Sequence, residues 1–287
     1  MARLLVIGTG LIGGSFALAM RSAGCFSHIE GYDADVSAAA RAAKLGVIDS
    51  AANDPDAAIA SADAVLIAVP TTAIADLVRQ IAQHAGRREI TVFDAGSVKG
   101  SVLAELRRGG GVPGWFVPSH PMAGSEHHGP GSADGDLFRH RQVIVTPQPE
   151  TDRAAIARVS GWWRAAGATV VETSAPIHDE MVALTSHLPH LVAYAFMNWV
   201  DQPHSGAPRD FAGPGLRDFT RIAASKPHMW RQISVENRAA ILAQFDGFAR
   251  SLDEIVEHLR DGRFDELEKL LERAQRARLR LTDEPDE

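Results

Sequence analysis

His120 follows a short predicted strand, residues 115–118, and lies in a segment rich in polar residues and glycine. A histidine titrates near neutral pH, so it suits the removal of a proton from an alcohol while a hydride leaves the same carbon. The alternative is a histidine in a surface loop, which is reasonable in a chain with 12 histidines. The position therefore indicates acid–base chemistry on a hydroxyl group.

Three glycines near the start of the chain have the spacing of a dinucleotide-binding turn. Gly8, Gly10 and Gly13 follow the apolar run 4–7 and precede an alanine-rich segment that favours a helix. In such a turn the first glycine permits the tight bend, the second lets a pyrophosphate approach the backbone, and the third lets the helix pack closely on the strand. Asp33 ends a second predicted strand, residues 28–33, and its carboxylate can accept both hydrogen bonds from an adenosine ribose.

The same turn predicts which residues hold the cofactor. The N–H groups at the start of the helix face the phosphates, and residues that end a neighbouring parallel strand, here the strand 64–69, flank the same crevice. We therefore expect the cofactor-binding residues to be Gly8, Gly10, Leu11, Ile12, Gly13, Asp33, Val69 and Pro70. Asp33 would repel a 2′-phosphate, and no lysine or arginine follows it until Arg41, so the predicted cofactor is NAD.

Ser97 and Lys99 follow another predicted strand, residues 90–94. Ser97 could hydrogen-bond the nicotinamide, His120 or the substrate, and Lys99 would supply positive charge. The alternative is that Ser97 caps the next helix, which it could do while facing the crevice.

The C-terminal half offers two further polar groups. His187 and His190 interrupt the apolar stretch 181–200, and each is either a ligand-binding residue or a histidine satisfied within the core. Arg221 could grip a carboxylate with its planar guanidinium group. Its alternative partner is Asp218, three residues earlier on the same predicted helix.

The elements that position these residues fall into two parts. Apolar strands at 4–7, 28–33, 64–69, 90–94, 115–118, 142–146 and 168–172 alternate with helices, which predicts one doubly wound parallel sheet of the α/β class. Ligands bind at the carboxyl ends of such strands, so we expect Gly10, Ser97, Lys99, His120 and Glu126 on one rim.

No strand pattern survives beyond Ser174. Helices are predicted at 181–200, from 219, at 234–260 and at 264–281, the last with Leu267, Leu270 and Leu271 facing inward. We therefore expect a Rossmann-type domain at residues 1–173 and an all-helical domain at residues 174–287. The apolar helix 181–200 and the apolar seam from 241 to 259 predict a homodimer.

Composition narrows the class of protein. A net charge of −7 argues against a nucleic-acid partner. Cys25 is the only cysteine, so no internal disulfide can form, which suits a reducing cytoplasm. The chain enters a strand almost at once, so we expect no signal peptide, and the polar residues in 181–200 exclude a membrane span there. No metal-ligand spacing is present, so no metal is predicted.

Five segments together carry a family resemblance. They are residues 8–15 (GTGLIGGS), 96–100 (GSVKG), 120–126 (HPMAGSE), 186–190 (SHLPH) and 218–223 (DFTRIA), the last followed by Met229 and Trp230. In order and content they resemble the prephenate/arogenate (cyclohexadienyl) dehydrogenase family of tyrosine biosynthesis. The first segment occurs in many dehydrogenases, whereas the other four together are specific.

The resemblance implies NAD(P)-dependent oxidative decarboxylation of prephenate, to 4-hydroxyphenylpyruvate, or of arogenate. It also implies a helical dimerisation domain after the Rossmann domain. On this likeness His120 is the catalytic histidine at the ring hydroxyl, Ser97 supports it, and Arg221 holds a substrate carboxylate. The remaining implied residues, around the substrate and the entrance, are Ser125, Glu126, His187, His190, Asp218 and Trp230.

The resemblance leaves open whether His187 or His190 faces the substrate, and whether prephenate or arogenate is preferred. We expect neither a chorismate mutase domain nor a regulatory domain, so tyrosine, if it inhibits, would act at the active site.

Two alternative functions remain at this point. A β-hydroxyacid or imino-acid dehydrogenase would place a catalytic lysine in the helical domain, but Lys226 is the only lysine between Ser174 and Gly262, and it precedes a proline. A dinucleotide-sensing protein without turnover would need Gly10 and Asp33 but neither His120 nor Arg221.

Overall fold

The computed structural model describes residues 2–84, 90–125 and 127–281. The chain divides into two compact units, Met1–Arg238 and Ala239–Glu287, and each is considered by itself.

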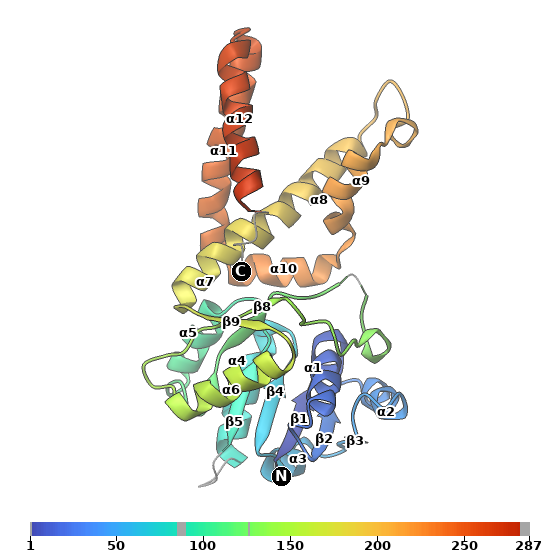
Figure 1. The fold of residues 1–287 in the computed structure, drawn as a ribbon, viewed down its shortest axis with the longest axis vertical. Coiled ribbons are helices and arrows are strands. Elements are labelled where there is room, and N and C mark those ends of the chain that lie inside the picture. The colour runs from blue at the N-terminus through green and yellow to red at the C-terminus, as the bar shows by residue number, and fades with distance from the viewer. Residues whose placement is uncertain (1, 85–89, 126, 282–287) are drawn as a thin grey trace. The chain divides into compact units, whose positions relative to one another are not determined.

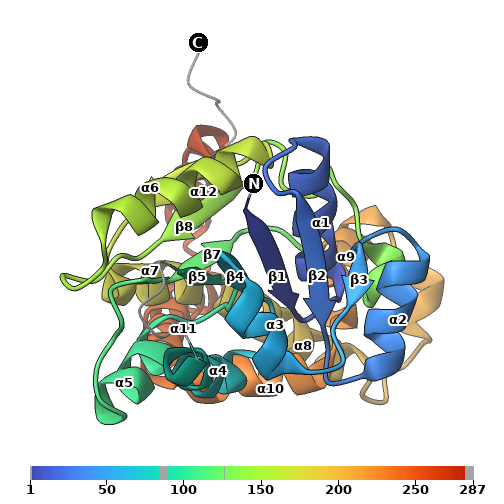
Figure 2. The ribbon, with the colours of Figure 1, turned by 90° about the horizontal axis from the view of Figure 1, so that it is seen from below.

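A parallel sheet forms the centre of the first unit (Figure 2). Within the described residues its strand order is β3-β2-β1-β4-β5-β6, the order of a Rossmann fold. These strands are β1 (Arg3–Ile7), β2 (His28–Tyr32), β3 (Ser50–Ala51), β4 (Ala64–Ile67), β5 (Thr91–Asp94) and β6 (Phe116–Val117). The predicted fold class, a parallel doubly wound sheet followed by helices, is confirmed.

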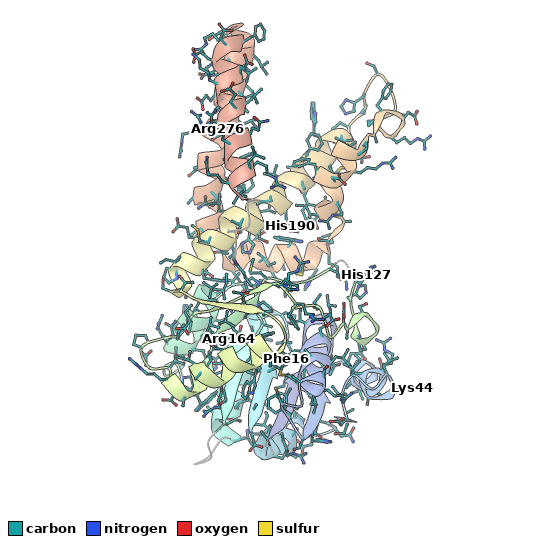
Figure 3. The ribbon with its side chains drawn as sticks, viewed as in Figure 1. Phe16, Lys44, His127, Arg164, His190 and Arg276 are labelled. Carbon is teal, nitrogen blue, oxygen red and sulfur yellow. The ribbon has the colours of Figure 1, made fainter. Side chains whose placement is uncertain are left out.

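Helices cover both faces of this sheet because its strands are apolar on both sides. In β1, Leu4 and Val6 pack toward α1 (Leu11–Ser22), α2 (Val36–Lys44) and α6 (Arg153–Ala165). Leu5 and Ile7 pack toward α3 (Pro55–Ser61), α4 (Thr71–His84) and α5 (Gly100–Arg108). Phe16 of α1, labelled in Figure 3, meets Trp163 of α6 edge to face, with ring centroids 4.7 Å apart.

The remaining strands form a second sheet, which the sequence did not predict. β8 (Gln142–Val145) pairs antiparallel with β7 (Ser119–Pro121) and parallel with β9 (Thr169–Glu172). The prediction of one continuous parallel sheet was therefore wrong. Pro118 lies between β6 and β7 and has no N–H to continue a ladder, so the chain leaves the first sheet there. As a result His120 lies within a strand and not in a loop.

The first unit ends in helices that lie over the carboxyl ends of the parallel strands (Figure 1). They are α7 (Ala175–Val182), a π-helical turn (Ala183–His187), α8 (Leu188–Val200), α9 (Pro214–Thr220), a 3₁₀ turn (Arg221–Ala224) and α10 (Pro227–Glu236). Shorter 3₁₀ turns occur at Pro130–Ser132 and Pro208–Phe211. The π-helical turn precedes Pro189, whose missing N–H breaks the regular α-helical ladder.

The predicted single helix 234–260 was also wrong, because the helix breaks at Asn237. Asn237 leaves helical geometry and turns its buried side chain inward, where Nδ2 donates to the Asp179 carbonyl over 2.8 Å. No helix among the described residues is long and apolar enough to cross a membrane.

The second unit is a helical hairpin of α11 (Arg238–Arg260) and α12 (Phe264–Arg280). Gly262, with φ +66°, makes the turn between them. Of the three leucines expected to face inward, Leu267 and Leu270 are half-buried, whereas Leu271 is 54% exposed. Two helices shield only one side of each other, so part of the predicted apolar seam stays open.

Candidate active site

The glycine-rich turn between β1 and α1 requires glycine at two positions. Gly8 has φ +97°, and a Cβ there would lie 2.2 Å from the Ala68 carbonyl oxygen. A Cβ on Gly13 would lie 2.0 Å from the Gly8 carbonyl oxygen. These contacts hold the turn tightly against the end of β4.

The outer side of this turn is open, as a bound pyrophosphate requires. Among the described residues, no heavy atom outside Gly10 and its two chain neighbours lies within 4 Å of the point where a Cβ on Gly10 would sit. Helix α1 begins at Leu11 without a side-chain cap, so the first-turn N–H groups, including those of Leu11 and Ile12, are available to an anion. The half-buried Val69 and the exposed Pro70 follow β4 beside the turn. The residues present therefore fit a dinucleotide.

Asp33 follows the end of β2 and is bonded directly to this turn. Its Oδ2 accepts hydrogen bonds from the Thr9 backbone N–H over 2.9 Å and from the Thr9 hydroxyl over 3.1 Å. Its Oδ1 accepts from the Asp35 N–H over 3.0 Å. These bonds fix a half-buried carboxylate beside the turn, and Thr9 is a contributor that the motif alone did not indicate.

Lys99 does not expose its side chain at the rim, which corrects the sequence prediction. Its side chain is fully buried, forms an ion pair with the equally buried Asp94, and donates to the Ser119 carbonyl oxygen over 2.8 Å. Removing one partner of such a pair typically costs about 3–5 kcal/mol, because the other charge stays buried and uncompensated. Asp94 also accepts a hydrogen bond from the Ser119 N–H over 2.9 Å, so this pair joins β5 to the strand that carries His120.

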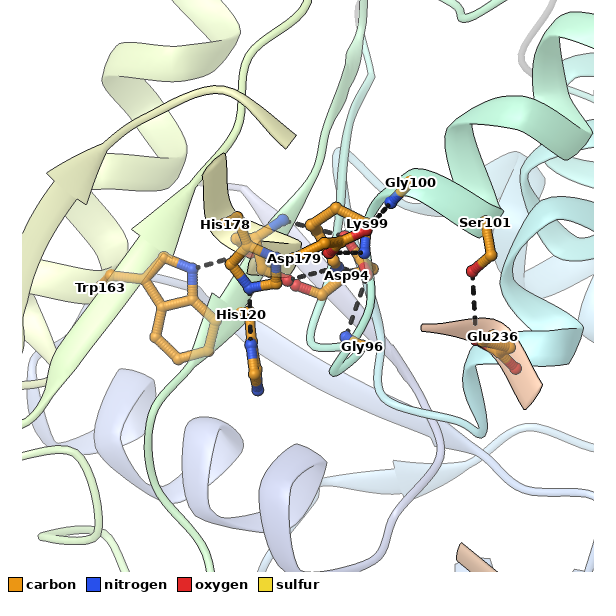
Figure 4. Close-up of polar contacts among 11 residues, drawn as sticks. Asp94, Gly96, Lys99, Gly100, Ser101, His120, Trp163, His178, Asp179 and Glu236 are labelled. Carbon is orange, nitrogen blue, oxygen red and sulfur yellow. Dashed lines mark hydrogen bonds and ion pairs between the residues drawn. The ribbon is translucent and has the colours of Figure 1, made fainter. Parts of the chain in front are cut away.

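His120 is half-buried in β7, and its two ring nitrogens differ. Nδ1 lies 2.9 Å from Nε2 of His178 in α7. Nε2 has no hydrogen-bond partner among the described residues and is not fully buried. It points away from His178 in Figure 4. Burial lowers the pKa of His120 well below 6.5, and the positive charge of the buried Lys99 lowers it further. His120 is therefore neutral at pH 7 and able to accept a proton.

His178 and Asp179 are site residues that the sequence analysis missed. Nδ1 of the buried His178 lies 2.7 Å from Oδ1 of Asp179. The Asp179 carboxylate also accepts from the backbone N–H groups of Lys99 and Gly100, over 2.9 and 2.7 Å, and so caps α5 (Figure 4). Burial opposes ionisation of Asp179, but these three hydrogen bonds outweigh it and lower its pKa.

His187 and His190 have different surroundings. His187 is 2% exposed, and its Nδ1 lies 3.1 Å from Nδ2 of Asn237. Burial lowers the pKa of His187 to about 4, against an opposing effect of Asp179. His190, on α8 in Figure 3, is half-buried and stacks on Trp230 with ring centroids 3.8 Å apart. His190 is therefore the more accessible of the two histidines.

Arg221 lies near His190. It belongs to the 3₁₀ turn that packs against α8, and its positive charge contributes, after burial, to the lowered pKa of His190. Arg221 is exposed and forms no ion pair within the described part of the chain, so the pairing with Asp218 is not made. The Trp230 indole N–H is buried and has no acceptor among the described residues.

The other predicted residues differ in their surroundings. The Ser97 hydroxyl has no partner among the described residues, and it does not cap α5, since Asp179 does. Ser125 and Asp218 are exposed, and Glu126 lies outside the described residues. No group of three or more histidine, cysteine or acidic side chains in the described residues could hold a metal ion.

A Rossmann sheet with an open glycine turn, a neutral histidine at its carboxyl side and an adjoining helical region define a class of dinucleotide-dependent oxidoreductases. Comparison with known proteins narrows this class. Residues 16–172 match the family description "Prephenate dehydrogenase, nucleotide-binding domain", and residues 174–273 match "Prephenate dehydrogenase, dimerization domain".

Individual relatives agree with these matches. The chain is 34% identical to the cyclohexadienyl dehydrogenase of Zymomonas mobilis, over 99% of this chain and 97% of that protein. It is 35% identical to the prephenate dehydrogenase of Bacillus subtilis, over 88% of this chain and 68% of that protein. The crystal structure of Aquifex aeolicus prephenate dehydrogenase with hydroxyphenyl propionate and NAD+ superposes with a TM-score of 0.90 at 32% identity, covering 98% of each chain.

The chain therefore belongs to the prephenate dehydrogenase family and is an oxidoreductase, as the motifs indicated. Family membership favours the dehydrogenase over both alternative hypotheses, the β-hydroxyacid or imino-acid enzyme and the sensor without turnover.

Proposed function

We propose that this chain catalyses the NAD-dependent oxidative decarboxylation of prephenate to 4-hydroxyphenylpyruvate in tyrosine biosynthesis, with arogenate as the other candidate substrate. The observation that carries the proposal is the state of His120. It is a neutral histidine with an open ring nitrogen, held at the carboxyl side of a dinucleotide-binding sheet. The family assignment supports the same reaction.

The role of His120 is to accept the proton of the ring hydroxyl. When bound, the nicotinamide supplies the hydride acceptor for the hydrogen on the same carbon. As the C–H and O–H bonds break, the bond to the ring carboxylate also breaks, carbon dioxide leaves, and the ring becomes aromatic. His120 then returns its proton to the phenolate oxygen, so the chain releases no net proton. Because aromatisation favours the products, the protein contributes mainly orientation and management of this proton.

The other residues hold the substrate in place. Arg221 binds a carboxylate, since its guanidinium group has no internal partner in the described residues and lies beside His190. We assign substrate contact to His190 and not to His187, whose ring is sealed against Asn237. Trp230 orients His190 by stacking, and the unpartnered Ser97 hydroxyl supports the contact at His120. Ser125, Glu126 and Asp218 stay assigned to the entrance by resemblance.

The cofactor assignment rests on the turn and on Asp33. Gly8, Gly10, Leu11, Ile12 and Gly13 give the pyrophosphate its backbone contacts, with Val69 and Pro70 beside them. The fixed Asp33 carboxylate accepts from the ribose and repels a 2′-phosphate, so we propose NAD over NADP.

We further propose a homodimer formed by the helical region, with a domain boundary at residues 173/174. The family description of residues 174–273 as a dimerization domain supports this assembly. Large apolar side chains are also exposed in this region, among them Trp199, Phe211 and Leu252, at 66%, 84% and 48%. Light scattering at micromolar concentration should give twice the mass of the 30.8 kDa chain, and a monomer would contradict the assembly.

The decisive test of the reaction is an absorbance assay for NADH with prephenate and NAD. Formation of 4-hydroxyphenylpyruvate and carbon dioxide in equal amounts to NADH is the expected result. Parallel assays with arogenate and with NADP determine the two preferences. Absence of turnover with both cyclohexadienes, in protein that binds NAD, would refute the proposal and favour the sensor.

A further inference from the structure

The hydrogen bonds behind His120 define which of its nitrogens carries a proton. Asp179 accepts from two backbone N–H groups, those of Lys99 and Gly100, and its pKa is lowered, so its carboxylate is ionised and can only accept. Nδ1 of His178, 2.7 Å from Oδ1 of Asp179, must therefore carry a hydrogen. With a single ring hydrogen, placed on Nδ1, His178 has an unprotonated Nε2, which can only accept.

The same logic passes to the next ring. Because Nε2 of His178 is an acceptor, the 2.9 Å contact requires Nδ1 of His120 to be the donor. A neutral His120 that is protonated on Nδ1 has its lone pair on Nε2. This is the nitrogen that has no partner among the described residues and points away from the cluster (Figure 4).

We propose that His178 and Asp179 are positioning residues that hold His120 in the tautomer whose basic nitrogen faces the substrate. The inference rests on the proposed role of His120 as the proton acceptor. When Nε2 takes the hydroxyl proton, the positive charge on His120 is hydrogen-bonded to His178 and, through it, to the Asp179 carboxylate. Neither residue touches the reacting atoms.

The arrangement also joins the two family regions of the chain. His120 belongs to the nucleotide-binding match at residues 16–172, whereas His178 and Asp179 belong to the match at residues 174–273. Asp179 caps the helix that follows Ser97, and its carbonyl accepts from Asn237, which contacts His187. A loss of activity on changing Asp179 could thus be structural, so the test must read the tautomer itself.

The experiment compares His178→Leu and His178→Gln in the full-length protein labelled with ¹⁵N-histidine. The ¹⁵N shifts report which ring nitrogen is protonated, and His120→Asn identifies the His120 signals by deleting them. We expect Nδ1–H for His120 in the unchanged protein and Nε2–H in His178→Leu, because the acceptor for Nδ1–H is lost. His178→Gln should keep Nδ1–H, because its amide oxygen can accept this bond while its amide N–H₂ donates to Asp179.

Kinetics supply the second measurement. His178→Leu should lower kcat by roughly tenfold to a hundredfold with little change in KM, because the base is misoriented while substrate binding is intact. His178→Gln should recover most of kcat. His84→Leu, at the C-terminal end of α4 and partly exposed, is the matched control and should leave kcat and the His120 shifts unchanged.

The outcomes separate this inference from the proposed function. Turnover that requires His120 but survives His178→Leu, with the His120 tautomer unchanged, would overturn the inference and leave the function standing. A protein without turnover would refute the function, while the ¹⁵N shifts still decide the tautomer. If His178→Leu does not fold, Asp179→Asn and His178→Gln take its place. Asn at 179 can donate to Nδ1 of His178 and so reverse both tautomers, and retention of Nδ1–H on His120 in Asp179→Asn would contradict the relay.

Discussion

Replacement of Arg221 by alanine isolates substrate binding from folding. Arg221 is exposed and forms no ion pair within the described residues. Its removal therefore leaves no buried charge without a partner in the free enzyme. Changes at such surface positions usually alter the free energy of unfolding by no more than about 0.5 kcal/mol. The cost of the substitution should therefore arise only when a substrate carboxylate is bound.

The magnitude follows from the character of that contact. Loss of one partner of a desolvated, hydrogen-bonded charge pair costs about 2–5 kcal/mol. The lower end applies here, because Arg221 starts from an exposed position where solvent screens its charge. About 2 kcal/mol corresponds to a roughly thirtyfold rise in KM for prephenate, at about 1.4 kcal/mol per decade. Arg221→Lys should recover only part of this loss, since an ammonium group cannot bind a carboxylate through two parallel hydrogen bonds.

The assay is initial-rate NADH formation, with NAD affinity of the free enzyme measured separately. Arg217→Ala, an exposed arginine on α9, is the matched control and should leave KM near its original value. A second measurement is independent of substrate: loss of the Arg221 charge should raise the pKa of His190, which NMR titration detects. Unchanged KM in correctly folded Arg221→Ala would refute the assignment and require another carboxylate anchor.

Three further predictions concern the base, the cofactor and acid stability. His120→Asn should lower kcat roughly a hundredfold or more with KM little changed, and a rise in KM with kcat preserved would make His120 a binding residue. Asp33→Ser should lower the ratio of kcat/KM with NAD to kcat/KM with NADP. Comparable kcat/KM values with the two cofactors in the unchanged protein would contradict the cofactor prediction. Because burial lowers the pKa of His187 from 6.5 to about 4, its contribution to stability is complete above pH 6.5 and is lost as the pH falls toward 4. The loss amounts to about 3 kcal/mol, which urea unfolding should detect between pH 7 and pH 4 and which His187→Asn should remove.

The nucleotide half of the site could be predicted because its determinants are local. Gly8 and Gly13 are required by contacts within one strand–turn–helix unit and the end of the adjacent strand, and their spacing is visible in the sequence. The helix start at Leu11 and the position of Asp33 after β2 follow from the same unit. Because the local backbone geometry requires particular residues at fixed spacing, the sequence motif is enough to predict it.

Lys99 shows where this local logic fails. Its position after a strand predicted an exposed charge, yet its side chain turns inward to Asp94 and the Ser119 carbonyl. The partner at Ser119 belongs to β7, a strand of the second sheet that the sequence did not predict. A buried ion pair depends on which segments meet in space, and residue type alone gives no sign of it.

The residues that position His120 could not be predicted from a sequence motif. His120 and His178 are 58 residues apart in the sequence, and Lys99 and Asp179 are 80 apart. A histidine followed by an aspartate at the start of a helix has no distinctive spacing. Its role becomes visible only in the structure, where Asp179 caps α5 and His178 contacts His120 in β7. The nucleotide turn is common to many dehydrogenases, whereas the direction of the basic nitrogen of His120 depends on the contact between β7, in the second sheet, and α7. Changes at that contact that leave the glycine turn intact should therefore impair proton transfer before they impair NAD binding.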